Sequence, residues 1–203
     1  MNIARYKPNR ERGMTLLEVL VAIVISAFGL LGLAGLMSRM QVAEVEGYQR
    51  SQALVLLQDM HERILAANPS TSAASNAYAL GLGSPLGTGD AQPASCAGLT
   101  GTALDLCEWS NELKGAAETD AGGNNVGAML GARGCIELVT APDPTSGICV
   151  PGTFRVSVVW QGLTGTAAPP TTCGTGLYGA ESLGKRRAVA AQFDVGLHDC
   201  TPP

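Results

Sequence analysis

The segment from Val19 to Ser38 constrains the fold of this chain most, because it runs for 20 residues without a charged side chain. As an α-helix, its apolar part from Val19 to Met37 would extend about 29 Å, close to the ~30 Å thickness of a bilayer's hydrocarbon core. The apolar region of a secretory signal peptide is shorter, at about 7–15 residues. We therefore expect a helix that lies in a membrane or in an equally apolar environment.

One carboxylate, Glu18, stands directly before this run, and the residues on its N-terminal side, Leu16 and Leu17, are already apolar. A charge in hydrocarbon costs about 2.5–3.5 kcal/mol on insertion scales and usually has a partner. A plain signal anchor leaves Glu18 unexplained, and so does a signal peptide cleaved near Ala34-Gly35. A mere marker of the membrane edge is the simplest alternative.

The charge of the chain is uneven. Residues 1–13 hold four Lys or Arg against one Glu, a net charge of +3. The whole chain has a net charge of −4, so residues 14–203 have a net charge of −7. This basic leader predicts that residues 1–13 stay in the cytoplasm and that the rest lies outside. The acidic remainder argues against a nucleic-acid surface. We interpret its basic cluster, Lys185-Arg186-Arg187, as a solvated loop before a strand.

The helix is expected to continue beyond the apolar run. Apolar residues recur at helical spacing on one stripe, with polar residues between them, and Asn68-Pro69 ends the pattern. A helix from Met14 to Ala67 has 54 residues, and it would be about 80 Å long. We expect residues 14–38 to form its membrane half, 39–68 its amphipathic half, and 69–203 a soluble domain. The stripe comprises Ala53, Leu56, Leu57, Met60 and Ile64.

The six cysteines all follow the apolar run, and none forms a C-x-x-C pair. An even number of cysteines beyond a membrane segment indicates disulfides in an oxidising compartment, although reduced thiols in a cytosolic protein are the alternative. Six cysteines allow 15 connectivities. Short loops favour the pairs Cys96–Cys107, Cys135–Cys149 and Cys173–Cys200.

The soluble domain predicts an α+β fold. Residues 70–134 are mostly connecting structure, with one helix over 103–113 that Thr102 would cap and whose Trp109 would pack on the long helix. Three strands laid as an antiparallel sheet on the amphipathic helix would bury both apolar faces. The strands are expected at 135–140, 154–160 and 187–195, and 161–185 is a long loop.

Enzyme motifs are weak or missing in the sequence. There is no G-x-S-x-G and no H-E-x-x-H pattern. The G-x-G-x-x-G match from Gly174 to Gly179 follows a loop and not a strand, which argues against dinucleotide binding. Residues 120–125 lack EF-hand spacing. We expect no enzyme activity, no cofactor and no metal; adhesion at exposed loops stays open.

The string from Gly13 to Ala22, GMTLLEVLVA, resembles the N-terminal signature of type IV pilins and pseudopilins, with Met14 where Phe is commonest. The resemblance implies that prepilin peptidase cleaves between Gly13 and Met14 and that the new N-terminal Met14 is N-methylated. It also implies that Glu18 pairs with the amine of a neighbouring subunit during filament assembly. An internal pair is the alternative, because Met14 and Glu18 are one helical turn apart.

The second half resembles, less strongly, the minor pilins called type IV pilus modification protein PilV. The resemblance rests on Asp105–Trp109, Leu113 and the strand that ends at Trp160. It implies a type IV pilin-like fold and a minor pilin that helps to start pilus assembly at the inner membrane. The implied partners are other minor pilins, the major pilin, prepilin peptidase, the assembly machinery and, before assembly, the bilayer. A minor pseudopilin of type II secretion is the alternative, and a pilus-tip adhesin is another.

Overall fold

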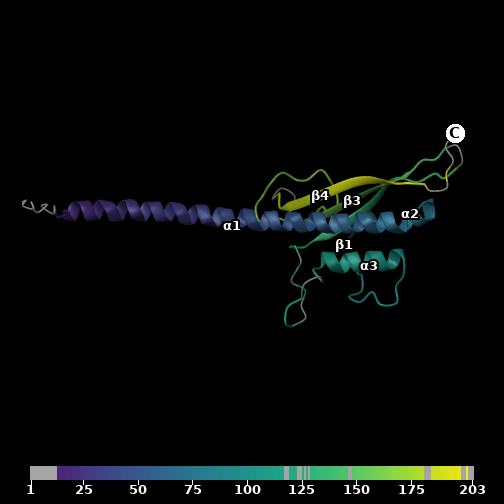
Figure 1. Cartoon of the computed structure of the whole chain (residues 1–203), viewed down its shortest axis with the longest axis horizontal. Coiled ribbons are helices and arrows are strands. Elements are labelled where there is room, and N and C mark those ends of the chain that lie inside the picture. Colours follow the sequence, from purple (N-terminus) through teal and green to yellow (C-terminus); the bar gives the residue numbers. More distant parts are fainter. Residues whose placement is uncertain are drawn as a thin grey trace, which may run out of the picture. The chain divides into compact units, whose positions relative to one another are not determined.

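The computed structural model describes residues 13–116, 119–122, 125, 127, 129–145, 148–180, 184–197 and 200. The chain divides into two compact units, Met1–Glu44 and Val45–Pro203, and each is described by itself. The long helix α1, Leu16–Ala67, contributes to both units (Figure 1). It begins two residues later than the sequence predicts and ends at the expected residue. The predicted cytoplasmic leader lies outside the described residues, except for Gly13.

The first unit consists of the apolar part of α1. An 18-residue window in this helix has a mean hydropathy of 2.6, and none of its residues is buried. By length and composition α1 is suited to cross a membrane, and no other helix in the described part of the chain is. An apolar surface of this size is unfavourable in water, so it needs lipid or another apolar surface to cover it.

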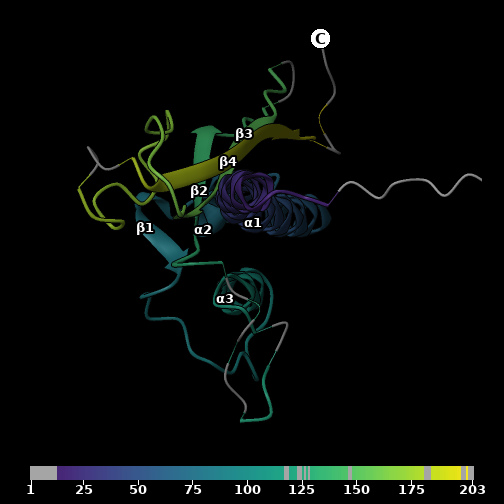
Figure 2. The ribbon, with the colours of Figure 1, turned by 90° about the vertical axis from the view of Figure 1, so that its left-hand side faces the viewer.

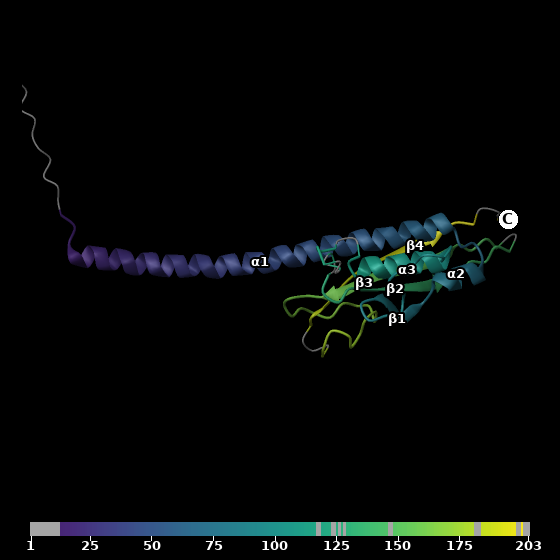
Figure 3. The same ribbon diagram turned by 90° about the horizontal axis from the view of Figure 1, so that it is seen from below.

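The second unit contains an antiparallel sheet in which four strands are described: β1 (Gly81–Gly87), β2 (Arg133–Thr140), β3 (Gly152–Gln161) and β4 (Arg186–Val195). The strands lie in chain order, with β1 and β4 at opposite edges (Figure 3). The prediction of a long helix on a small antiparallel sheet is confirmed. Each predicted strand is present with slightly longer bounds. The sequence did not predict β1, whose GLGSPLG composition has low strand propensity.

The core of this unit lies between α1 and the sheet. The predicted stripe on α1 is confirmed, because Ala53, Leu57, Met60 and Ile64 are buried and Leu56 is partly buried. Across from it, the inward-facing side chains of β3 are buried as predicted. Burying one such side chain contributes about 1.5–3 kcal/mol, so this interface supplies much of the driving force for folding. The β3 side chains are Phe154, Val156, Val158 and Trp160.

Helix α3, Thr102–Leu113, lies on another side of α1 from β3 and β4 in the view of Figure 2. Its N-cap is Gly101 and not the predicted Thr102, which is already the first helical residue. Gly101 adopts φ +56°, and no side chain caps the helix N-terminus. Trp109 packs on α1 as predicted: it is fully buried, and its Nε1 donates to the Leu56 carbonyl oxygen at 2.8 Å. Gly134 makes room for this indole, since an added Cβ there would lie 2.0 Å from the ring.

Helix α2, Ser72–Tyr78, was also not predicted from the sequence. The Thr71 hydroxyl accepts a hydrogen bond from the Ala74 amide at 3.2 Å and so caps its N-terminus. Tyr78 at its end is buried in the main core, and its hydroxyl donates to Asp105 of α3. This short helix therefore connects the end of α1 to α3.

The disulfides join Cys96 to Cys107, Cys135 to Cys173 and Cys149 to Cys200. The first pair agrees with the sequence-based expectation, and the other two expected pairs, Cys135–Cys149 and Cys173–Cys200, are wrong.

The register of the sheet explains both differences. Cys135 pairs with Ser157 of β3, five residues from Gly152 where that strand begins, which is about 17 Å at ~3.3 Å per residue. A disulfide requires Cα atoms less than ~7 Å apart, so Cys149 beyond the start of β3 is out of reach of Cys135. Val195 pairs with Gly152, which brings the C-terminal Cys200 beside Cys149 instead.

Candidate processing and assembly segment

The predicted cleavage point lies in exposed backbone. Gly13, Met14 and Thr15 precede α1 and are not helical. The Met14 side chain is 68% exposed, and no described atom lies within 4 Å of a Cβ added at Gly13. A peptidase must bind its substrate in an extended form, which a helix with paired backbone groups does not offer. The Gly13–Met14 peptide bond therefore has the local structure that cleavage requires.

Thr15 and Glu18 together form the start of α1. The Thr15 carbonyl oxygen accepts from the amides of Glu18 at 3.0 Å and Val19 at 3.2 Å, and its Oγ1 accepts from the Glu18 amide at 3.3 Å. This is half of a capping box, the Thr-x-x-Glu pattern at helix N-termini. The carboxylate in the first turn also interacts favourably with the positive end of the helix dipole. This capping role was not predicted from the sequence, although the T-x-x-E spacing signals it.

The partner expected for Glu18 does not exist in the uncleaved chain. The Met14 nitrogen is a peptide nitrogen in the described structure and becomes an amine only when residues 1–13 are removed. Glu18 is exposed, as are the residues around it. The geometry therefore leaves its carboxylate accessible to a cation from outside the chain, and the proposed pairing remains a prediction.

The apolar part of α1 offers small residues for close helix packing. Gly29, Gly32 and Gly35 recur every three residues, and no described atom lies within 4 Å of a Cβ added at any of them. Large exposed apolar side chains surround them, including Phe28 and Leu31. Small residues let other helices approach closely in an apolar environment, so this surface fits lipid or a bundle of similar helices.

The predicted solvated basic cluster is instead part of the folded head, here meaning the unit Val45–Pro203. Arg186 is 6% exposed and donates to the carbonyl oxygens of Thr171 and Cys173 at 2.5 and 2.9 Å. Arg187 forms an ion pair with Glu46 of α1 at 3.1 Å. The sequence interpretation was wrong because these arginines open β4, where neighbouring backbone carbonyls and one carboxylate satisfy their charges.

Glu46 is the acceptor that holds this end of the head together. Its Oε1 accepts from the amides of Leu163 and Thr164 and from the Thr164 hydroxyl, each at 3.0–3.1 Å. Burial alone would raise the pKa of Glu46, but the hydrogen bonds from Thr164 and the charge of Arg187 outweigh it and hold the pKa below its usual value. Glu46 is therefore an ionised anchor that ties α1 to the connection between β3 and β4.

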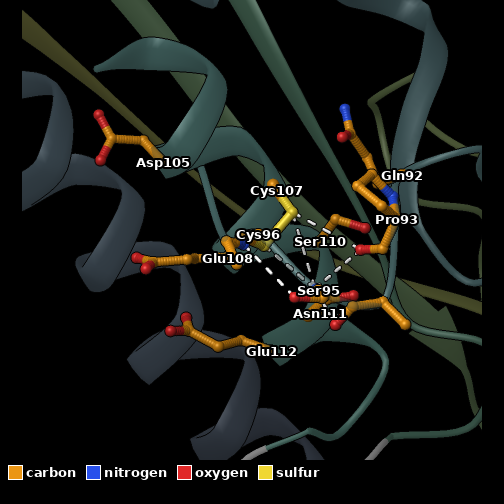
Figure 4. The surroundings of a disulfide bond; sticks show 12 residues. Gln92, Pro93, Ser95, Cys96, Asp105, Cys107, Glu108, Ser110, Asn111 and Glu112 are labelled. Carbon is orange, nitrogen blue, oxygen red and sulfur yellow. Dashed lines mark hydrogen bonds between the residues drawn. A yellow bond between two sulfur atoms is a disulfide. The ribbon is translucent and has the colours of Figure 1, made fainter. Parts of the chain in front are cut away.

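A second charged cluster joins α1 to α3. Arg63 of α1 is surrounded by four carboxylates at 2.6–3.7 Å, which belong to Asp59, Asp105, Glu108 and Glu112. Figure 4 shows Asp105, Glu108 and Glu112 projecting together from one face of α3. Burial and the nearby carboxylates of Asp59 and Glu108 raise the pKa of Glu112 to about 7, although Arg63 opposes them. The single positive charge of Arg63 therefore does not neutralise the four carboxylates around it.

The opposite face of α3 carries the Cys96–Cys107 disulfide (Figure 4). Asn111 lies beside it and donates from Nδ2 to the carbonyl oxygens of Pro93 and Ala94 at 3.1 and 3.2 Å. Because the disulfide and Asn111 act on the same loop, they hold it against α3. These cysteines are structural, and the described residues contain no group of three or more His, Cys, Asp or Glu that could hold a metal ion.

Comparison with known proteins gives one match. Residues 8–34 match the family model described as "Prokaryotic N-terminal methylation motif". No curated protein and no solved structure gives a significant match. The matched segment contains Gly13, Met14 and Glu18, and it supports a type IV prepilin-like protein, either a pilin or a pseudopilin. The long helix, small antiparallel sheet and three disulfides are consistent with a type IV pilin fold.

Proposed function

We propose that the protein is a minor pilin of a type IV pilus that helps other minor pilins to start pilus assembly. Prepilin peptidase cleaves it between Gly13 and Met14, and Met14 is then N-methylated. The observation that carries this proposal is the Gly-Met-Thr-Leu-Leu-Glu sequence set in accessible backbone before a fully exposed apolar helix. The family match over residues 8–34 and the pilin-like head support it.

In this proposal the chain passes through two apolar environments. Residues 14–38 first span the inner membrane, with residues 1–13 in the cytoplasm and the disulfide-bonded head in the periplasm. The three disulfides fit an oxidising compartment. During assembly the same residues leave the lipid and pack among the helices of other subunits, where the small residues permit close contact. The protein then belongs to a pilus on the cell surface.

Glu18 links cleavage to assembly. An ionised carboxylate in an apolar bundle is unfavourable unless a cation pairs with it. Cleavage creates one such cation per subunit, the α-amino group of Met14, and the carboxylate of Glu18 in a neighbouring subunit binds it. In a chain that is not cleaved, the Met14 nitrogen is part of a peptide bond and carries no charge. The pair therefore selects processed subunits and sets their axial register.

Intact mass spectrometry of the native protein tests the processing step. The mass should lack residues 1–13, carry one added methyl group and lack six hydrogens for three disulfides. Retention of residues 1–13 in a protein that works normally would refute the proposal. The same spectrum after reduction should gain the six hydrogens, which separates the disulfide prediction from the cleavage prediction.

The location of the mature protein distinguishes the alternatives. A minor pilin should be found in pili sheared from the cell surface, and its deletion should reduce pilus number. A pseudopilin of type II secretion would be missing from sheared pili, and its deletion would instead block secretion. An adhesin would leave pilus number unchanged and reduce attachment.

A further inference from the structure

A pocket of about 310 Å³ lies in the head among residues of α1, β3 and β4. Its space exists because two of its lining residues are small: no described atom lies within 4 Å of a Cβ added at Gly47, and Ala188 carries one methyl group. The pocket is lined by Glu46, Gly47 and Arg50 of α1, Trp160 of β3, and Arg187 and Ala188 of β4.

The two arginines of the pocket differ in their partners. The Arg187 guanidinium donates to Glu46, to the Thr164 and Gly184 carbonyl oxygens and to the Thr166 hydroxyl at 2.7–3.1 Å. Its charge is therefore paired with that of Glu46. Arg50 is exposed and makes no hydrogen bond or ion pair with any residue in the described ranges. The pocket thus presents one unneutralised guanidinium.

Trp160 contributes to the pocket wall. The residue is 3% exposed, and its indole Nε1 is buried without an acceptor among the described residues. This Nε1 is closed off from the outside, so the donor that the pocket offers a ligand is the Arg50 guanidinium. The exposed apolar side chains of Val45 and Tyr48 flank Glu46 and Gly47 on α1. Such a surface fits a protein partner better than a free ion.

We propose that this pocket receives an acidic side chain of the adjacent pilin-like subunit. Its carboxylate pairs with Arg50. The aliphatic part of the acidic residue fills the space above Gly47 and Ala188. The identity of the partner as a fibre subunit rests on the proposed function, whereas the carboxylate specificity rests on the pocket alone.

Replacing Arg50 with lysine makes the contact chemically detectable. A carbodiimide activates a carboxylate, and a lysine amine in contact with it displaces a urea and forms an amide, a reaction that arginine does not undergo. Membranes and sheared pili from cells that express full-length Arg50→Lys protein are treated and digested, and crosslinked peptides are identified by mass spectrometry. We expect an adduct between Lys at position 50 and an Asp or Glu of another chain, and none in the wild type.

Two further variants control the assignment. In the wild type, Arg155 forms an ion pair with Glu137 of the same chain at 2.8 Å, so the amine of Arg155→Lys should lie near Glu137 and give an intrachain adduct alone. Gly47→Leu combined with Arg50→Lys fills the pocket, and we expect loss of the interchain adduct. Gly47→Ala in the same background leaves most of the space and should retain it.

The outcomes separate the two proposals. An interchain adduct in membranes from a protein that never reaches pili supports the pocket and contradicts the pilus assignment. A protein found in sheared pili that gives no adduct at position 50, or an adduct to Glu46 of its own chain alone, overturns the pocket proposal and leaves the pilus assignment intact. An adduct that persists with Gly47→Leu also overturns it, because the partner would then lie outside the pocket.

Discussion

Glu18 combines a local function at the start of α1 with a proposed function in assembly. Its backbone amide and its place in the first turn contribute to the start of α1, while its carboxylate is available to pair with an amine after cleavage. The hydrogen bond to Thr15 uses the backbone amide of residue 18 and is retained in a substitution, and glutamine is also a favoured residue at this position of a capping box. The second function needs a negative charge. Substitutions that preserve shape can therefore separate them.

We predict that Glu18→Gln is inserted in the membrane and cleaved but is incorporated into pili about tenfold less than the wild type, a ratio that corresponds to ~1.4 kcal/mol. Glu18→Ala should behave similarly. Glu44→Gln, an exposed carboxylate further along the same helix, is the control and should be incorporated normally. The measurement is quantitative immunoblotting of sheared pili against total membranes. Normal incorporation of Glu18→Gln would show that capping, and not charge pairing, explains this residue.

The site was predictable from the sequence where it depends on neighbouring residues. The Gly13-Met14 junction and Glu18 belong to one continuous motif, and the structure places them in accessible backbone and in the first helical turn. The contact between Glu46 and Arg187 was not predictable, since 141 residues separate the two and nothing local to either signals the other. The wrong prediction for Lys185-Arg186-Arg187 has the same cause, because charge alone does not reveal which carbonyl groups the fold brings to an arginine.

At the scale of secondary structure, periodicity predicted the elements that bury one face. The stripe on α1 and the alternation along β3 are both present, because burial of these faces drives the fold. The edge strand β1 has no such pattern: it contains Pro85 and three glycines, and pairing with β2 makes it a strand. Two disulfide pairs were mispredicted for the same reason, since strand register decides which cysteines meet.

The packing of α3 on the sheet depends on a glycine in β2. A Cβ at Gly134 would overlap the Trp109 ring at 2.0 Å, and the indole cannot move because its Nε1 is hydrogen-bonded to α1. We predict that Gly134→Ala destabilises the head by about 3 kcal/mol, the upper range for overpacking, and lowers Tm by about 6–12 °C.

Gly83→Ala in β1 is the matched control, because it is also a strand glycine but no described atom lies within 4 Å of its added Cβ. Its Tm should change by less than a quarter of the change in Gly134→Ala. Thermal unfolding of residues 39–203 followed by circular dichroism measures both. Equal shifts for the two variants would show that the loss does not come from the indole contact.

The Arg63 cluster makes the α1–α3 contact sensitive to pH. The folded state raises the pKa of Glu112 to about 7 from its ordinary value of 4.5, so the folded chain binds this proton more tightly than the unfolded chain does. The resulting stability is fully present below about pH 4.5 and is lost as the pH rises through about 7. Glu46, whose pKa is lowered, acts in the opposite direction but at more acidic pH.

We therefore predict that the head loses stability on the order of 1 kcal/mol between pH 5 and pH 8, allowing for solvent screening of the partly exposed carboxylate. Glu112→Gln should reduce this difference by at least half, because a neutral side chain does not titrate. Urea unfolding of residues 39–203 at the two pH values provides the measurement. Glu137→Gln, a carboxylate paired with Arg155 on the sheet, should leave the pH difference unchanged. A wild-type head that is more stable at pH 8 would contradict this account.

At the scale of the whole molecule, the apolar half of α1 and the folded head place different demands on the chain. The head is stabilised by its own core, by three disulfides and by the Glu46 and Arg63 ion pairs, all within Val45–Pro203. The first unit has no buried residue in its apolar window and depends on lipid or on other chains. Variants in the first 18 residues should therefore change processing or assembly without changing the stability of the head.

Gly13→Val tests whether processing must precede assembly. No described atom lies near a Cβ added at Gly13, so the substitution should affect neither folding nor membrane insertion. We predict that prepilin peptidase fails to cleave this variant, that its intact mass retains residues 1–13, and that it is strongly but measurably depleted in sheared pili. Gly196→Val, also at a glycine whose added Cβ meets no described atom within 4 Å, controls for the substitution itself.

Combining the two N-terminal variants identifies the reason for the defect. If Glu18 acts by pairing with the amine that cleavage creates, then Gly13→Val removes the cation and Glu18→Gln removes the anion of the same interaction. The double variant should then be incorporated no less than Gly13→Val alone, because contributions from one pair are not additive. Independent defects would instead multiply. A double variant that assembles better than Gly13→Val would also support pairing, since removing the unpaired carboxylate relieves the cost of burying it.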